Sequence, residues 1–129
     1  MTGKVIYSLL SSDATLTALV PAAKMFPYVL NENTDLPAIV YGIIDVSPEY
    51  TKDGKAQDIT DFSVISISPS YANLQDIAAA VRGALEMKVG TVGTALIQHI
   101  HMTGMNESYL QDVGVFTNEM SFNVNVINY

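Results

Sequence analysis

The side chains in this sequence with the clearest potential for chemistry are two histidines, His99 and His101, separated by one residue. Side chains at positions i and i+2 of a β-strand point to the same side, so the two imidazoles can approach one metal ion. A metal site needs at least a third ligand. Glu107 or Asp112 supplies it only if the connection after the strand folds back. We expect no metal site and interpret the pair as polar-face histidines at a surface or interface.

Other patterns that would support catalysis are missing from the sequence. It contains no Gly-x-Ser-x-Gly nucleophile elbow. Both histidines lie in one strand segment, so the sequence shows no combination of serine, acid and histidine for nucleophilic catalysis. Asp58 and Asp61 fall on opposite faces of a predicted strand, so we interpret them as surface acids. The glycines between residues 83 and 104 follow a helix and precede a strand, which is the wrong order for a phosphate cradle. We therefore expect no catalytic residue and no cofactor.

The composition excludes several classes of protein. The net charge is −7, and six basic residues scattered among thirteen acidic ones offer no patch for phosphates, so we expect no direct binding of nucleic acid and none of an anionic membrane. The absence of cysteine removes disulfides and thiolate chemistry. The N-terminal segment lacks a secretory signal, and no apolar run reaches the ~18–20 residues of a membrane span. We expect a protein of the cytoplasm, or one assembled from a cytoplasmic pool.

The length and the low charge bear on domain number and on partners. A chain of 129 residues fits one domain, which is large enough to bury a hydrophobic core without disulfide bonds or a structural metal. Charged residues make up 15% of the sequence, where about a quarter is typical of soluble domains. Low charge together with 49% hydrophobic residues indicates that a partner covers some apolar surface.

Apolar spacing predicts three helices. In the first, apolar residues between positions 5 and 10 recur at the spacing of one helical face. Ser12 or Asp13 can cap a second, short helix, which Pro21 ends. A third helix starts at residues 68–70, where a serine cap precedes an apolar stripe. The members of that stripe are Tyr71, Leu74, Ile77, Ala78, Val81 and Leu85.

Alternation and β-branched residues predict the strands. These run over residues 23–27, 38–46, 59–68, 95–105 and 115–127. The run 38–46 is continuously apolar, as in a strand buried on both faces. The segment after Gly104 is interpreted as a connection with a helical turn around Tyr109 and Leu110. In the last strand polar and apolar residues alternate strictly, so one face is buried and the other is polar. The polar face carries Thr117, Glu119, Ser121, Asn123 and Asn125.

Together these elements predict a fold class. We expect a single α+β domain over residues 1–129, with a mainly antiparallel four- to five-stranded sheet and helices packed on one face.

Residues 47–58 form the most polar segment, and we interpret it as a long hairpin loop. Its centre combines one aromatic residue with mixed charge: Glu49, Tyr50, Thr51, Lys52 and Asp53. Tyrosine is favoured at protein contacts, so the loop is a candidate partner surface, although an idle solvated loop fits the same residues.

Taken in order, several short phrases resemble a known family. They are Leu16-x-x-Leu19, Lys24-Met25-Phe26-Pro27, the strand entry Leu36-Pro37-Ala38-Ile39-Val40-Tyr41, and the helix Ile77 to Leu85 with its Val81-Arg82-Gly83-Ala84-Leu85 end. The arrangement resembles the tail-completion, or tail-terminator, proteins of long-tailed bacteriophages and prophages over nearly the full chain. The His99-Ile100-His101 strand departs from that pattern.

The resemblance implies a structural role in the virion tail. Members of the family form a ring, usually a hexamer, which caps the completed tail tube and joins it to the neck or head-completion protein, without cofactor or catalysis. Such a ring needs head-to-tail contacts between copies. The resemblance therefore implies that residues 47–58 reach a neighbouring subunit or the tube, that the polar face of strand 115–127 forms the ring surface, and that assembly takes place in the host cytoplasm.

Three alternative interpretations stay open at the level of sequence. One is a neck or head-closure adaptor of the same particle. The second is a small ligand- or metal-binding domain that uses His99 and His101. The third is a monomeric accessory protein whose polar loop is idle.

Overall fold

The computed structural model describes residues 2–30, 35–52 and 54–128, which form three α-helices, one 3-10 turn and six strands. Their bounds are α1 (Thr2–Ser12), α2 (Ala14–Leu19), η1 (Ala22–Lys24), β1 (Met25–Pro27), β2 (Ala38–Thr51), β3 (Gly54–Ser68), α3 (Tyr71–Leu85), β4 (Gly90–Val92), β5 (Ala95–Leu110) and β6 (Val115–Asn128). The predicted loop around residues 31–35 lies mostly outside the described residues.

The strands form one strongly twisted sheet in the order β1-β2-β3-β6-β5-β4. β1 is parallel to β2, and every other neighbouring pair is antiparallel. The sheet has six strands, so the predicted four to five was too few. The additional strand is β4, which forms a tight hairpin with β5 where we expected only a turn, because Gly93 takes a positive φ of 62° and reverses the chain at once.

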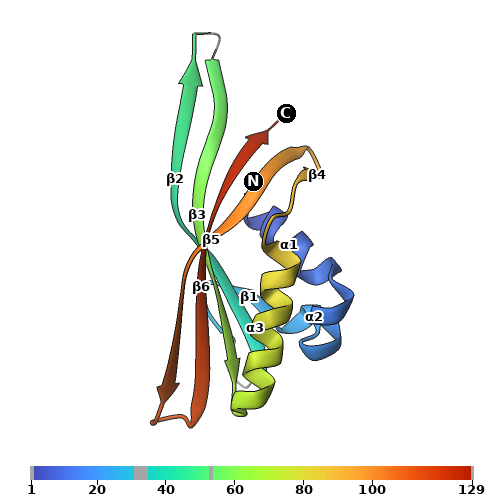
Figure 1. The fold of residues 1–129 in the computed structure, drawn as a ribbon, viewed down its shortest axis with the longest axis vertical. Helices are drawn as coiled ribbons and strands as arrows, with labels where there is room; N and C mark the ends of the chain where they lie inside the picture. Colours follow the sequence, from blue (N-terminus) through green and yellow to red (C-terminus); the bar gives the residue numbers. More distant parts are fainter. Residues whose placement is uncertain (1, 31–34, 53, 129) are drawn as a thin grey trace.

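All three helices cover one face of the sheet, as expected (Figure 1). α3 packs directly on β3 and β6, and α1 and α2 pack beside it. None of the helices among the described residues is long and apolar enough to span a membrane.

Both predicted helix caps are confirmed. The Asp13 carboxylate accepts a hydrogen bond from the Leu16 backbone N–H at 2.9 Å, which starts α2. The Ser70 hydroxyl accepts one from the Asn73 N–H at 3.4 Å, which starts α3. A helix of six residues is unstable alone, so α2 depends on the burial of Leu16 against the rest of the core.

The core lies between the helices and the sheet and is centred on one rung of β3 and β6. Phe62 and Phe122 are paired across that rung and are fully buried, with their rings stacked at 5.3 Å. The predicted alternation of β6 is confirmed, because Met120, Val124 and Val126 are buried on the same face.

The predicted loop at residues 47–58 is wrong. β2 continues to Thr51 and β3 begins at Gly54, so the polar segment is a two-stranded ribbon. Hydrogen bonding between the two strands overrides the weak strand preference of Pro48, Lys52 and Gly54. The ribbon extends beyond the rest of the sheet (Figure 1), and we call residues 46–58 the arm. The burial of β2 on both faces is confirmed only for residues 38–41.

The predictions for β5 are partly wrong. The strand continues to Leu110, so the expected connection with a helical turn is a straight extension of the strand. A bulge between Gln98 and His101 also shifts the faces, and Ile97, Ile100 and Met102 all contribute to the core. In a regular strand, side chains alternate between the two faces, so Ile97 would lie on the face opposite to that of Ile100 and Met102.

Candidate interaction surfaces

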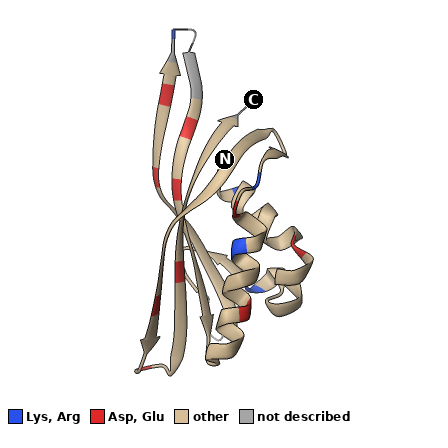
Figure 2. Cartoon of the chain, viewed as in Figure 1, with Lys and Arg blue, Asp and Glu red and all other residues tan. Residues whose placement is uncertain are grey.

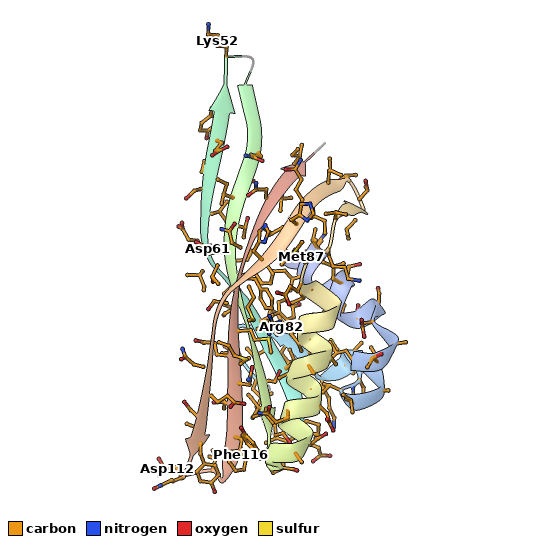
Figure 3. The ribbon with its side chains drawn as sticks, in the orientation of Figure 1. Lys52, Asp61, Arg82, Met87, Asp112 and Phe116 are labelled. Carbon is orange, nitrogen blue, oxygen red and sulfur yellow. The ribbon has the colours of Figure 1, made fainter. Side chains whose placement is uncertain are left out.

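The arm presents most of its side chains to solvent. Tyr50 is 71% exposed, and Lys52 lies at the very tip (Figure 3). Glu49 is exposed and accepts a hydrogen bond from the Gln57 side chain across the ribbon at 2.6 Å, which ties the two strands together near the tip. Asp53 lies outside the described residues, as does the side chain of Thr51. Three of the five candidates are thus placed: Glu49 and Tyr50 lie on β2, and Lys52 lies in the turn at the tip of the ribbon.

The polar candidates of β6 lie on the sheet face opposite the helices. Each of them is paired in register with a residue of the neighbouring strand β3. Asn123 donates a hydrogen bond to the carboxylate of its partner Asp61 at 2.8 Å. Glu119 is exposed, whereas Thr117, Ser121 and Asn123 are half-buried. We call this side the open face.

A groove of about 520 Å³ runs along the lower part of the open face. Ile65, Ile67 and Leu110 supply its apolar floor, and Thr117 and Glu119 are among its polar walls. The sequence identified the β6 residues of this groove but not Leu110, because it assigned that residue to a helical turn.

The end of the β5–β6 hairpin is a surface that the sequence analysis missed. Its exposed apolar residues are Met105, Tyr109, Leu110 and Val113, each between 48% and 66% exposed. The Phe116 ring lies between those of Tyr71 and Tyr109, at 5.3 and 4.7 Å, and so connects the hairpin to α3. Figure 3 shows Phe116 and Asp112 at this end of the molecule, opposite Lys52. The sequence carries little signal for this strand, because residues 106–108 between Met105 and Tyr109 are all polar or charged.

Glu107 fastens the same hairpin to the start of α3. Its carboxylate accepts hydrogen bonds from the Tyr71 hydroxyl at 3.1 Å, from the Asn118 amide at 3.3 Å and from the Gln75 amide. The hydrogen bond and the negative charge of Glu107 raise the pKa of Tyr71 above its usual value, because the carboxylate favours the protonated phenol. Three donors from two elements therefore fix the position of this one carboxylate.

The two histidines come together as the sequence suggested, but without a metal site around them. Their rings lie 6.1 Å apart in a stacked arrangement, and both are exposed. The bulge gives His99 a φ of 23°. Within the described parts of the chain, no group of three or more His, Cys, Asp or Glu residues is placed to hold a metal ion. Glu107 is turned toward α3 and serves a different role.

The two aspartates at the start of β3 also differ from their prediction. They lie on opposite faces as expected, but Asp58 is buried at 5% exposure, so it is not a surface acid. Its register opposite Val126 places it on the helix side of the sheet, where the surrounding strands cover it.

Charge is unevenly distributed between the two layers (Figure 2). The strands carry acidic residues from one end of the molecule to the other (Figure 2), and the basic residues of the sheet side are both in the arm: Lys52 in the turn at its tip and Lys55 in β3. Lys4, Lys24, Arg82 and Lys88 all lie in the helices or at their ends. No lysine or arginine follows Lys88 in the sequence. The sheet side is thus acidic and suits a partner that carries basic residues.

A second groove, of about 710 Å³, separates α2 from α3. Its walls are mostly small side chains, including Ala18, Ala79 and Gly83, with Asp13 and Asp76 as its charged members. Asp13 is already engaged as the cap of α2. The groove offers shape but brings no nucleophile and base together.

Extended hairpins, an acidic open face and exposed aromatic residues define a protein that acts by contact with other proteins, in the class of structural assembly proteins. The model of the family described as "Tail completion protein gp17" matches residues 4–126. The chain therefore belongs to this phage tail-completion family, and it is a structural protein of tail assembly rather than an enzyme.

Solved structures share the fold. A chain of the "Virion of native gene transfer agent (GTA) particle" is similar with a TM-score of 0.78 and 21% identity, over 94% of this chain and 90% of that one. A second solved structure matches with a TM-score of 0.64 and 14% identity, over 100% of this chain and 98% of its own. No curated protein matches the sequence.

Proposed function

We propose that copies of this protein form a closed ring, a hexamer by preference, that caps the completed tail tube and joins it to the neck or head-completion protein. Family membership supports the role in tail completion. The similar chain from a gene transfer agent virion supports a place within an assembled particle. The ring contains no cofactor and is assembled in the host cytoplasm before it becomes part of the virion tail.

The observation that carries this proposal is the pair of hairpins at opposite ends of the long axis (Figure 1). The arm extends beyond the helices at one end, and the β5–β6 hairpin reaches the other end. A protein that joins two partners needs a contact surface toward each of them. Lys52 at the tip of the arm and exposed Val113 at the end of the β5–β6 hairpin supply contact groups for the two partners.

Truncation of the arm tests its part in the assembly. Glu49 and Gln57 are paired across the ribbon, so an Asn-Gly turn can replace residues 50–56 without changing the register below. We expect the truncated protein to keep its fold, because the removed part lies outside the core, and to lose ring formation or tail joining. Light scattering on purified protein measures the first, and electron microscopy of unjoined heads and tails measures the second.

The matched control exchanges only the exposed tip residue, Tyr50→Ser, in a full-length arm. We expect this variant to show a partial loss if the tyrosine makes contact. Full ring formation together with full tail joining after truncation would contradict the role of the arm. An unfolded truncated protein, detected by circular dichroism, would contradict the independence of the arm from the core.

A further inference from the structure

Among the residues that the structure describes, two strands of the sheet each leave a seven-residue stretch bonded on one side only. On β2, residues 45–51 pair with β3 beyond the point where β1 ends. On β5, residues 104–110 pair with β6 beyond the point where Ile100 bonds to the backbone of Lys88. We call these the β2 edge and the β5 edge. Each is about 24 Å long, at roughly 3.4 Å per residue.

The β5 edge lacks the devices that usually prevent strands from adding to a free edge. Soluble proteins protect such edges with proline, lysine or inward-pointing charge. Residues 104–110 contain no proline and no basic residue. Their one charged side chain, Glu107, is held against α3 by Tyr71, Gln75 and Asn118. The backbone donors and acceptors of this edge are therefore left accessible to another strand.

The β2 edge is a suitable partner for it. Proline cannot donate a hydrogen bond to β3, so its nitrogen belongs on the free side, and Pro48 removes one donor from that side. Only alternate residues direct their backbone groups to the same side, so Val46 and Tyr50 supply the donors next to it. The two edges match in length, since each spans seven residues. Exposed Val46 and Tyr50 on β2 find apolar counterparts in Met105 and Tyr109 on β5.

The two edges lie on opposite sides of the sheet. In the strand order β1-β2-β3-β6-β5-β4, the free side of β2 faces the β1 border and that of β5 faces the β4 border. A contact between unlike edges is head-to-tail, so each added copy leaves one edge of each kind free until the assembly closes. β2 runs toward the tip of the arm, and β5 runs toward the opposite end (Figure 1). Because the two edges lie toward opposite ends of the long axis, they meet antiparallel in a ring whose subunits are inclined, so that the arm of one copy lies beside the β5–β6 hairpin of the next.

Charge argues against one competing contact. The β2 edge carries Asp45 and Glu49, and Lys52 lies at its end. The β5–β6 hairpin carries Glu107, Asp112 and Glu119 and no basic residue. Pairing of two β5 edges would therefore bring only carboxylates together, whereas the β2 edge brings one basic residue with it.

We propose that the β2 edge of one copy pairs antiparallel with the β5 edge of the next copy, so that the six-stranded sheet continues from subunit to subunit. This inference rests on the proposed assembly of identical copies. It specifies the contact that joins them: a backbone ladder with Tyr50, Met105 and Tyr109 packed along it. Most of the affinity then comes from the backbone, and the side chains determine which edges meet.

The absence of native cysteine allows a direct test by cross-linking. With the centres of the two edges aligned, Ser47 faces Ser108 of the next copy. We would purify the single variants Ser47→Cys and Ser108→Cys, mix them, and treat the mixture with a short bifunctional maleimide. The expected product is a dimer of one chain of each kind, and a chain with both cysteines is expected to give a ladder of multiples. The matched control replaces Ser108→Cys by Ser12→Cys, an exposed serine at the end of α1, and is expected to give at least ten-fold less product.

Several outcomes would overturn the inference. Cross-links chiefly between two Ser47→Cys chains, or between two Ser108→Cys chains, would show a two-fold contact in place of a head-to-tail one. Wild-type protein that assembles by light scattering, while its variants give no Ser47–Ser108 product, would refute the edge pairing and leave the ring intact. A protein that stays monomeric in every mixture, with tail tube protein added, would refute the ring and the edge pairing together.

Discussion

The stacked rings of Phe62 and Phe122 allow a quantitative test of what stabilises the sheet between the two hairpins. The rings lie on one rung of β3 and β6 with centroids 5.3 Å apart, and both side chains are fully buried. Asp61, the neighbour of Phe62 in the chain, lies near the middle of the long axis of the molecule (Figure 3). Weakening this pair should loosen the sheet at the point from which both hairpins extend.

The perturbation is Phe62→Leu, Phe122→Leu and the double variant. Truncation to alanine costs about 3–5 kcal/mol from a buried Phe and about 2–5 kcal/mol from a buried Leu, so the loss of ring burial costs each single variant about 0.5 kcal/mol, the difference between the midpoints. The lost ring-to-ring contact adds about 0.5–1.5 kcal/mol. Each single variant should therefore lose about 1–2 kcal/mol of unfolding free energy, against a total of roughly 5–15 kcal/mol.

The double variant loses the ring contact only once, so its loss should fall short of the sum by about 0.5–1.5 kcal/mol. Urea unfolding followed by circular dichroism measures all four proteins. Phe116→Leu is the control, because its ring is half-buried at the end of the hairpin and should cost less than either core variant. A coupling below about 0.3 kcal/mol would refute the stacked pair as an energetic unit, and an equally large loss in Phe116→Leu would refute the central position of the rung.

Two further predictions concern the start of α3. Ser70→Ala removes the oxygen that accepts from the Asn73 N–H and should lower the unfolding free energy by about 0.5–2 kcal/mol. Ser70→Asp should retain most of the stability in the same urea titration, and an equal loss in both variants would argue against capping. For Tyr71, the raised pKa means that its contribution to stability is present below the unfolded value near 10.0 and is lost as the pH rises through the folded value. Tyr71→Phe should therefore flatten the fall in unfolding free energy above pH 10.0, and so should Glu107→Gln. Tyr41, whose pKa burial raises, titrates in all these proteins, so equal slopes in wild type and Tyr71→Phe would contradict the assignment.

Local signals predicted the elements whose energetics are themselves local. The caps at Asp13 and Ser70 depend on side chains three residues from their donors, and the sequence indicates both correctly. The alternation of β6 follows from one buried face, and its candidates Thr117 to Asn123 all lie on the other face. The helix layer and the antiparallel sheet follow from the same patterns.

The errors concern features that depend on pairing between distant residues. Polar residues of the arm form strands because β2 and β3 satisfy each other's backbone, not because of their own preferences. The bulge before His101 depends on the register between β5 and β6, and it changes the face of the residues up to the second register shift between Met102 and Gly104. Leu110 belongs to a strand because Val115 lies opposite.

The sequence by itself determined the composition, the helix caps, the polar face of β6 and the family to which the chain belongs, since each depends on residue type or on spacing within a few positions. Only the tertiary structure decided which surfaces are available for contact. Strand order and register left the β2 and β5 edges unpaired, and hydrogen bonds from Tyr71 and Asn118 turned Glu107 away from one of them. These are properties of residues far apart in the chain. No pattern within a short window contains the information that brings them together.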